Sequence, residues 1–200
     1  MERPLDLSDR THWIFDMDGT LTVPMHDFAW LHRALDVPEG QDVLATIELR
    51  PPERAAADRE VIRLWEEDVA RRARPQDDAV ALLEALVRRG RTLGVLTRNT
   101  LAGARLTLDA AGLAGYFDAG AIVSRDCAPP KPHPGGGLRL LRQWGVTAEA
   151  AVVVGDWIYD AQAGRAAGAA TVLVMRHGPQ PWGDEADLLV DDFWGLAGRV

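Results

Sequence analysis

Residues 13–20 read Trp-Ile-Phe-Asp-Met-Asp-Gly-Thr and place two carboxylates at the end of the first apolar run of the chain. Bulky residues such as those at 13–15 suit a buried β-strand. Because strand side chains alternate between faces, Asp16 and Asp18 are expected on one side, and Gly19 permits a sharp exit with a positive φ. Two like charges this close destabilise each other unless a cation or a shared proton offsets them. A solvated Asp-x-Asp-Gly turn without a function is the alternative. Residues elsewhere in the chain must distinguish between the two interpretations.

The 200-residue chain, of which 47% is hydrophobic, suits one globular domain or a core domain with a small insertion. Its 22 basic and 30 acidic residues give a net charge of −8, which argues against a nucleic-acid surface and means that an anionic substrate needs a local cation. Cys127 is the only cysteine, which excludes an intrachain disulfide. The first residues do not show the basic-then-apolar pattern of a leader peptide, and no apolar run approaches the roughly 20 residues of a membrane span. We expect a cytoplasmic protein without membrane contact, either a monomer or a homodimer.

The pattern after Thr20 is helical and later becomes an alternation of helices and strands. Helices are expected over 26–35, 42–49 and 53–74, so residues 22–76 form an all-helical segment. On the longest of these helices, the charged face that includes Glu66 is expected to be solvated. From residue 77 onward, helices over 80–87, 101–111, 137–144 and 159–167 alternate with strands over 93–96, 121–123, 151–154 and 171–174. A short strand and a last helical turn are expected in the tail. This alternation predicts an α/β fold with a parallel sheet, built from residues 1–21 and 77–200.

Polar side chains follow several of these strands at the point where each strand ends. Asp16 and Asp18 follow the first strand, Thr97 the second and Asp156 the fourth, and Lys131 lies in a loop on the same side. Ligands of parallel α/β sheets bind beyond the carboxyl ends of the strands. We therefore expect these five residues to converge although they are widely separated in the sequence.

The acidic members of this group form a site of hard oxygen ligands. Asp16, Asp18 and Asp156 suit Mg²⁺, which prefers carboxylates, carbonyls and water. Histidine and cysteine do not occur at these strand ends, which makes zinc a poorer fit. The sequence therefore predicts Mg²⁺ as the cofactor.

An anion site is expected beside the metal. Lys131, Thr97 and the backbone N–H groups of Arg98 and Asn99 at a helix start can bind a phosphate. A divalent cation, a lysine, a hydroxyl and a free carboxylate together indicate phosphoryl transfer, in which a carboxylate attacks phosphorus to form an aspartyl phosphate. Asp18 would protonate the leaving group and then activate water.

Four segments together resemble the motifs of the haloacid dehalogenase superfamily in order and approximate spacing. They are Asp16-Met17-Asp18-Gly19-Thr20, Thr97, Lys131-Pro132 and Gly155-Asp156-x-x-x-Asp160. The resemblance covers nearly the whole chain. Within the superfamily, the chain closely resembles phosphoglycolate phosphatases and β-phosphoglucomutases. It implies a Rossmann-like three-layer core, with a helical cap over residues 22–76 inserted after the first strand.

The resemblance also implies roles for single residues. Asp16 corresponds to the nucleophile, Asp18 to the general acid/base, and Thr97 and Lys131 to phosphate binders. The implied Mg²⁺ ligands are the Asp16 carboxylate, the backbone carbonyl of Asp18 and Asp156, with Asp160 in support outside the ligand set. The cap is short for this group, and Trp157 stands where a serine or threonine is common, so substrate identity does not carry over.

In enzymes that the chain resembles, the cap carries the residues that determine substrate specificity. His26 and Arg50 are our candidates there, and an arginine such as Arg50 can grip a second anionic group with two hydrogen bonds. An ordinary role in packing or on the surface is the alternative for each. The glycine run at 135–137 is expected to permit a loop turn.

The leading hypothesis is a Mg²⁺-dependent phosphatase acting on a small phosphorylated metabolite through an aspartyl phosphate. A phosphomutase of the β-phosphoglucomutase type would use the same four motifs. A dehalogenase is less expected, because carbon–halogen cleavage has no use for the second acid, Asp18. Two non-enzymes share the scaffold: a phospho-receiver-like domain and a catalytically silent phosphate-binding protein.

Overall fold

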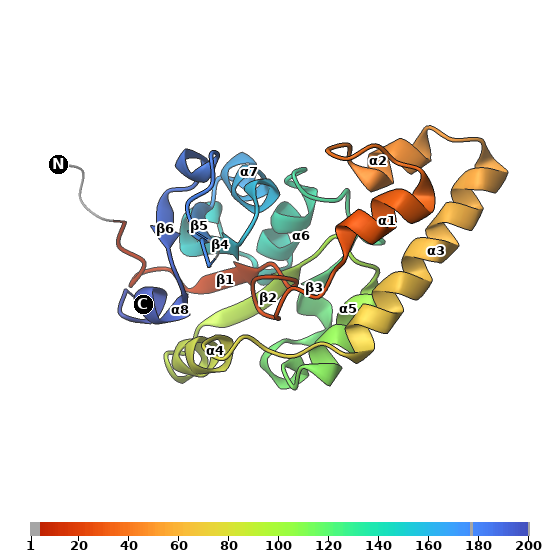
Figure 1. Ribbon diagram of the computed structural model, residues 1–200. Helices are drawn as coiled ribbons and strands as arrows, with labels where there is room; N and C mark the ends of the chain where they lie inside the picture. The colour runs from red at the N-terminus through yellow and green to blue at the C-terminus, as the bar shows by residue number, and fades with distance from the viewer. Residues whose placement is uncertain (1–4, 177, 200) are drawn as a thin grey trace.

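A six-stranded parallel sheet organises the molecule, with the strand order β3-β2-β1-β4-β5-β6 (Figure 1). The computed structural model describes residues 5–176 and 178–199. The strands are β1 (His12–Phe15), β2 (Thr92–Leu96), β3 (Ile122–Val123), β4 (Ala151–Gly155), β5 (Ala170–Val174) and β6 (Leu188–Val190). Every neighbouring pair is parallel, which confirms the α/β fold with a parallel sheet.

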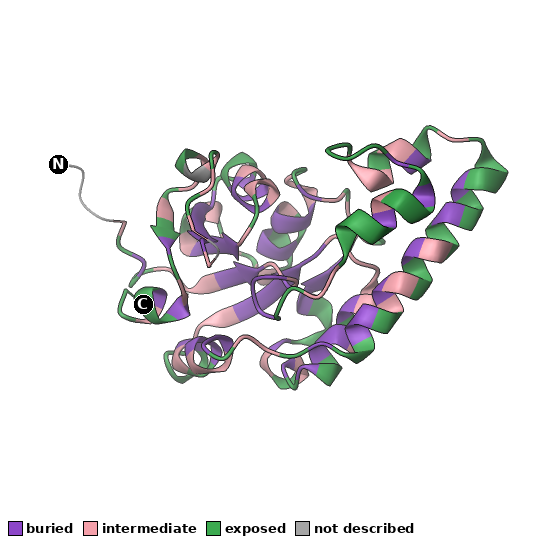
Figure 2. Cartoon of the chain, viewed as in Figure 1, coloured by how far each residue is buried: buried purple, intermediate pink, exposed green. Residues whose placement is uncertain are grey.

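Helices cover both faces of this sheet. They are α4 (Ala79–Arg88), α5 (Leu101–Ala110), α6 (Gly135–Trp144), α7 (Ile158–Ala167) and α8 (Phe193–Ala197). Alternation along β1 explains the two layers: Trp13 and Phe15 join the apolar cluster under α4, α5 and α8, whereas Ile14 joins the cluster under α6. All three side chains are fully buried, and the central strands of the sheet are coloured as buried along most of their length (Figure 2). The three-layer, Rossmann-like core is thus confirmed.

Three helices lie in the chain between β1 and α4: α1 (Phe28–Leu35), α2 (Val43–Glu48) and α3 (Pro52–Arg71). We call residues 28–71 the helical insert. It has its own small apolar cluster, which includes Leu35, Ile47 and Ile62, and α3 runs alongside α5 of the core (Figure 1). The helix α1 begins two residues later than expected, because the Asp27 side chain accepts a hydrogen bond from the backbone N–H of Trp30 and caps the helix.

Two sequence expectations about helices are corrected. Glu66 is buried rather than solvated, because the buried stripe of α3 passes through Ile62, Glu66, Val69 and Ala70. The glycine run does not form a loop turn but opens α6 at Gly135. A Cβ on the second glycine of that run would overlap with the side chain of Leu96 on β2, so the glycines allow α6 to pack closely on the sheet.

No helix within residues 5–176 and 178–199 is long and apolar enough to cross a membrane.

Candidate active site

The loop after β1, residues 16–22, folds back on itself. Asp16 N–H donates to the carbonyl of Val154 on β4 (2.8 Å), and the N–H groups of Leu21 and Thr22 both donate to the carbonyl of Met17 (2.9 Å each). Gly19 has a φ of +88°, which only glycine adopts without strain. A Cβ at this position would overlap with the carboxylate of Asp156. The glycine expected from the sequence therefore serves both the turn and the close approach of two strand ends.

Replacing Gly19 should cost more than its φ alone explains. We expect Gly19→Ala to lower the free energy of unfolding by roughly 2–3 kcal/mol, through αL strain together with displacement of Asp156. Gly40→Ala is the matched control, because Gly40 has a φ of +83° and open space around a Cβ, and we expect it to cost about 1 kcal/mol. Urea unfolding of both variants makes the comparison. Equal losses would show that Asp156 adapts freely.

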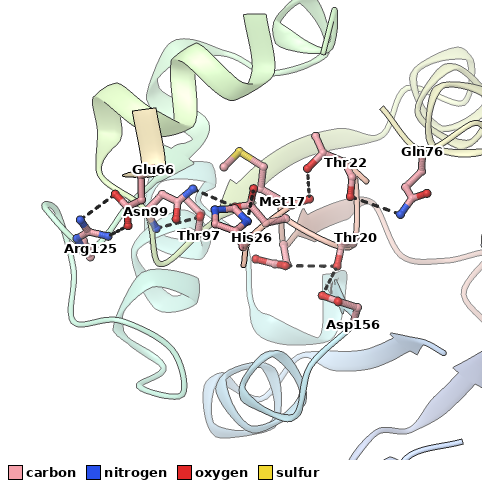
Figure 3. A network of polar contacts seen from close by, with 12 residues as sticks. Met17, Thr20, Thr22, His26, Glu66, Gln76, Thr97, Asn99, Arg125 and Asp156 are labelled. Atoms are coloured by element: carbon pink, nitrogen blue, oxygen red, sulfur yellow. Dashed lines mark hydrogen bonds and ion pairs between the residues drawn. The ribbon is translucent and has the colours of Figure 1, made fainter. Parts of the chain in front are cut away.

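Three carboxylates meet around one lysine: Asp16 follows β1, Asp156 follows β4, and Asp160 lies in the first turn of α7. Asp16, Asp156 and Asp160 each offer an oxygen, and these oxygens lie within 4.8 Å of one another. Lys131 Nζ is 2.5 Å from Asp16 Oδ1 and 2.5 Å from Asp160 Oδ1. The Thr20 hydroxyl donates to Asp156 Oδ1 at 3.0 Å and is 3.4 Å from Asp16 Oδ2 (Figure 3). The structure thus places Asp160 within the carboxylate group, where the sequence analysis had expected it only in support.

Crowding and burial shape the charges of this cluster. Burial, followed by the charges of Asp16 and Asp160, raises the pKa of Asp156 above its ordinary value. Burial also raises the pKa of Asp160. For Lys131, burial acts to lower the pKa, but Asp16 and Asp160 outweigh it and the pKa is raised. The lysine is therefore a permanent cation among carboxylates that are unfavourable to ionise together.

Asp18 lies apart from this cluster and faces the β2 loop. Its Oδ2 accepts a hydrogen bond from Asn99 Nδ2 at 2.9 Å, and His26 Nδ1 is 3.8 Å from its Oδ1. Burial, followed by the charge of Asp16, raises the pKa of Asp18 to about 8. Burial lowers the pKa of His26 to about 4. At neutral pH the Asp18 carboxyl is thus protonated and able to donate a proton, beside a neutral imidazole.

Asp18 should reduce stability at alkaline pH. The unfolded carboxyl ionises near pH 4, whereas the folded one stays protonated to about pH 8, so the free energy of unfolding falls as pH rises through this window. Asp18→Asn removes that penalty. Because 22% of the Asp18 side chain is exposed, solvent screens part of it, and we expect the variant to be more stable by roughly 1–2 kcal/mol at pH 8.5. Denaturant unfolding at pH 5 and 8.5 tests this: a gain that does not grow with pH would contradict the raised pKa.

The expected phosphate-binding residues lie together in the loop between β2 and α5. Thr97 is buried, and its hydroxyl accepts the backbone N–H of Asn99 at 3.1 Å. The Arg98 side chain turns toward the helical insert, where it pairs at 2.5 Å with Asp42, the N-cap residue of α2. Its guanidinium also lies over the ring of Tyr159, 5.1 Å from the centroid. The structure thus brings Asn99 next to Asp18, holds Thr97 against the Asn99 backbone, and pairs the Arg98 side chain with the helical insert.

A second link between core and insert was missed by the sequence analysis. Glu66 of α3 accepts two hydrogen bonds from Arg125, at 2.5 and 3.0 Å (Figure 3). Arg125 also donates to the carbonyl of Arg98 at 2.8 Å. The available signal was the position of Glu66 four residues after Ile62, on the stripe that α3 buries.

The two candidate specificity residues have different surroundings. His26 lies beside Asp18, as described above. Arg50 Nη1 is 2.7 Å from Asp58 Oδ2, and its Nη2 donates to the carbonyl of Asp36 at 3.0 Å. The contacts of Arg50 are therefore within the helical insert, and the structure does not bring it to the carboxylate cluster.

Comparison with known proteins agrees with this geometry. The haloacid dehalogenase-like hydrolase model of the "Hydrolase" family matches residues 30–168. A haloacid dehalogenase-like hydrolase domain-containing protein of Arabidopsis thaliana is 29% identical, over 89% of this chain and 78% of its own length. A phosphoglycolate phosphatase of Xylella fastidiosa is 29% identical, over 89% of this chain and 87% of its own. The crystal structure of a hydrolase from Pseudomonas syringae superposes with a TM-score of 0.79 at 25% identity, covering 94% of this chain and 97% of its own. The resemblance inferred from the four motifs is confirmed, and the chain belongs to the haloacid dehalogenase-like hydrolases.

Proposed function

We propose that this protein is a Mg²⁺-dependent phosphatase that hydrolyses the phosphomonoester of a small metabolite through a phosphorylated Asp16. The observation that carries the proposal is the placement of Asp16. Its carboxylate lies 2.5 Å from a buried lysine, and the protonated carboxyl of Asp18 follows two residues later in the same loop. Phosphatases among its relatives, such as that of Xylella fastidiosa, support the same activity.

The donor set fits Mg²⁺. The carboxylates of Asp16, Asp156 and Asp160 offer hard oxygens within 4.8 Å of one another, and the resemblance adds the backbone carbonyl of Asp18. Such a group is the type of ligand that Mg²⁺ prefers, with water completing the set. When bound, Mg²⁺ would offset negative charge on the carboxylates and on the phosphoryl oxygens.

The residues themselves account for the two halves of the reaction. In the first, Asp16 attacks phosphorus, the bond to the leaving oxygen breaks, and Asp18 gives its proton to that oxygen. In the second, Asp18 accepts a proton from water, whose oxygen attacks phosphorus and releases Asp16. Lys131 and the loop of Thr97 and Asn99 hold the phosphoryl oxygens throughout.

We further propose that residues 22–76 form a cap over a core of residues 1–21 and 77–200. The helical insert has its own apolar cluster, and the ion pairs Arg98–Asp42 and Arg125–Glu66 join it to the core beside Asp18. A cap of this kind would exclude water during phosphoryl transfer. We place the enzyme in the cytoplasm, as a monomer or a homodimer.

Phosphate release from p-nitrophenyl phosphate, measured with Mg²⁺ and with EDTA, tests the function. We expect turnover with Mg²⁺ and its loss with EDTA, together with a phosphoryl adduct on Asp16 in intact-mass spectra after rapid quenching. A panel of phosphorylated metabolites then ranks substrates. Activity that is the same in EDTA would contradict the proposal, and interconversion of sugar phosphates without net phosphate release would indicate a phosphomutase.

Mg²⁺ should also stabilise the fold without any substrate, because it relieves repulsion among the three carboxylates. At a concentration about 100 times its Kd, we expect a gain of about 2.7 kcal/mol in the free energy of unfolding. Asp156→Asn should lose most of this gain, whereas the exposed control Asp109→Asn should keep it. Thermal unfolding over a Mg²⁺ titration measures both, and an unchanged midpoint in wild type would contradict the metal site.

A further inference from the structure

A row of aromatic rings leads outward from Asp18 to the helical insert. His26 comes first, 3.8 Å from Asp18 and with only 6% of its side chain exposed. Phe28 stacks on His26 with ring centroids 5.5 Å apart and is 58% exposed. Trp65 of α3 meets both edge-on, at 4.8 Å from His26 and 5.5 Å from Phe28. We call His26, Phe28 and Trp65 the aromatic wall.

Arginines that join the insert to the core, or lie within it, are already paired with acidic residues of the insert. Three arginines each hold one carboxylate: Arg98 pairs with Asp42, Arg125 with Glu66, and Arg50 with Asp58. Glu66 is buried, so breaking its pair with Arg125 would leave an uncompensated charge in the interior. Asp58 is buried as well and is held by Arg54, at 2.9 Å, in addition to Arg50. A second anionic group on a substrate would compete with these carboxylates for a guanidinium.

We propose that the aromatic wall selects phosphomonoesters whose leaving group presents an uncharged ring or apolar face, and that esters of hydroxy acids such as phosphoglycolate are poor substrates. The inference rests on the proposed function, because it concerns the leaving group of that reaction. Asp18 delivers its proton to the leaving oxygen, so the rest of the leaving group extends away from Asp18. The aromatic wall starts next to Asp18, at His26. At its outer end, the exposed ring of Phe28 offers a face on which a ring of the leaving group can stack.

Two phosphonates that resist hydrolysis allow binding of the leaving-group portion to be measured without turnover. Benzylphosphonate carries an apolar ring, and phosphonoacetate carries a carboxylate in its place. Calorimetry with the wild-type, Mg²⁺-loaded protein should give a Kd for benzylphosphonate at least about 10-fold lower than that for phosphonoacetate. Phe28→Ala should weaken benzylphosphonate by roughly 5- to 10-fold and leave phosphonoacetate unchanged. Trp30→Ala, an exposed aromatic residue on the same helix α1, is the matched control and should change neither.

The outcomes separate this inference from the proposed function. Phosphonoacetate binding as tightly as benzylphosphonate, no binding of either ligand, or equal effects of Phe28→Ala and Trp30→Ala would each overturn the role of the wall. Failure of the phosphatase itself would show differently, as the absence of Mg²⁺-dependent phosphate release from every ester while the preference between the two phosphonates remained.

Discussion

Asp16→Asn should lower the rate of phosphate release by at least about 10³-fold while leaving the protein folded. An amide is almost the same size as the carboxylate but has no free charge with which to attack phosphorus. The substitution also removes one negative charge from a group whose oxygens lie within 4.8 Å of one another. The variant loses one partner of Lys131 but keeps Asp160 at 2.5 Å, so we expect it to stay folded, and denaturant unfolding separates lost activity from lost structure.

Steady-state turnover of p-nitrophenyl phosphate measures this effect, with rapid-quench intact mass as a second readout. Wild type should show a phosphoryl adduct under turnover, and Asp16→Asn should show none. Asp160→Asn is the informative companion, since its carboxylate shares Lys131 with Asp16 but makes no attack, and we expect it to retain measurable activity. A variant Asp16→Asn with more than about a tenth of wild-type activity would contradict the role of Asp16 as the nucleophile.

Lys131→Met should weaken the fold more than any other substitution in the site. Lys131 is the only lysine of the chain, and its ammonium group is 2.5 Å from both Asp16 and Asp160. Methionine fills a similar volume without the charge, and the carboxylates then face one another without their cation. We expect a loss of roughly 3–5 kcal/mol without metal, which is typical for removing one partner from a buried ion pair.

Two measurements give this prediction its specificity. Saturating Mg²⁺ should return part of the lost stability, because it supplies positive charge to the same carboxylates, but should not restore turnover. Lys131→Arg keeps the charge and is the control: we expect it to be clearly more stable than Lys131→Met in denaturant unfolding. Equal destabilisation of the two variants would mean that packing, and not charge, explains the role of Lys131.

The sequence was sufficient for those features that depend on local pattern. The apolar run at residues 13–15 predicts a buried strand, which Asp16 and Asp18 follow. Because parallel strands end at the same edge of a sheet, the positions of Thr97, Lys131 and Asp156 after later elements predict their convergence. The structure places Lys131 against Asp16 and Asp160, whose oxygens lie within 4.8 Å of that of Asp156. The parallel sheet itself follows from the order of helices and strands.

The side-chain partners, in contrast, depend on contacts between distant parts of the chain. Glu66 was expected on the solvated face of its helix. Neighbouring residues on a helix differ by about 100° in direction, so a small error in locating the buried face misplaces a side chain. The packing of α3 against the core buries Glu66 beside Arg125. The structure likewise pairs Arg98 with Asp42, 56 residues away, and turns Asp18 toward Asn99, 81 residues away. Local pattern therefore determines which residues reach the edge of the sheet, whereas tertiary packing decides which charge each of them meets, because a charge in the interior is stable only beside a partner that the fold brings to it.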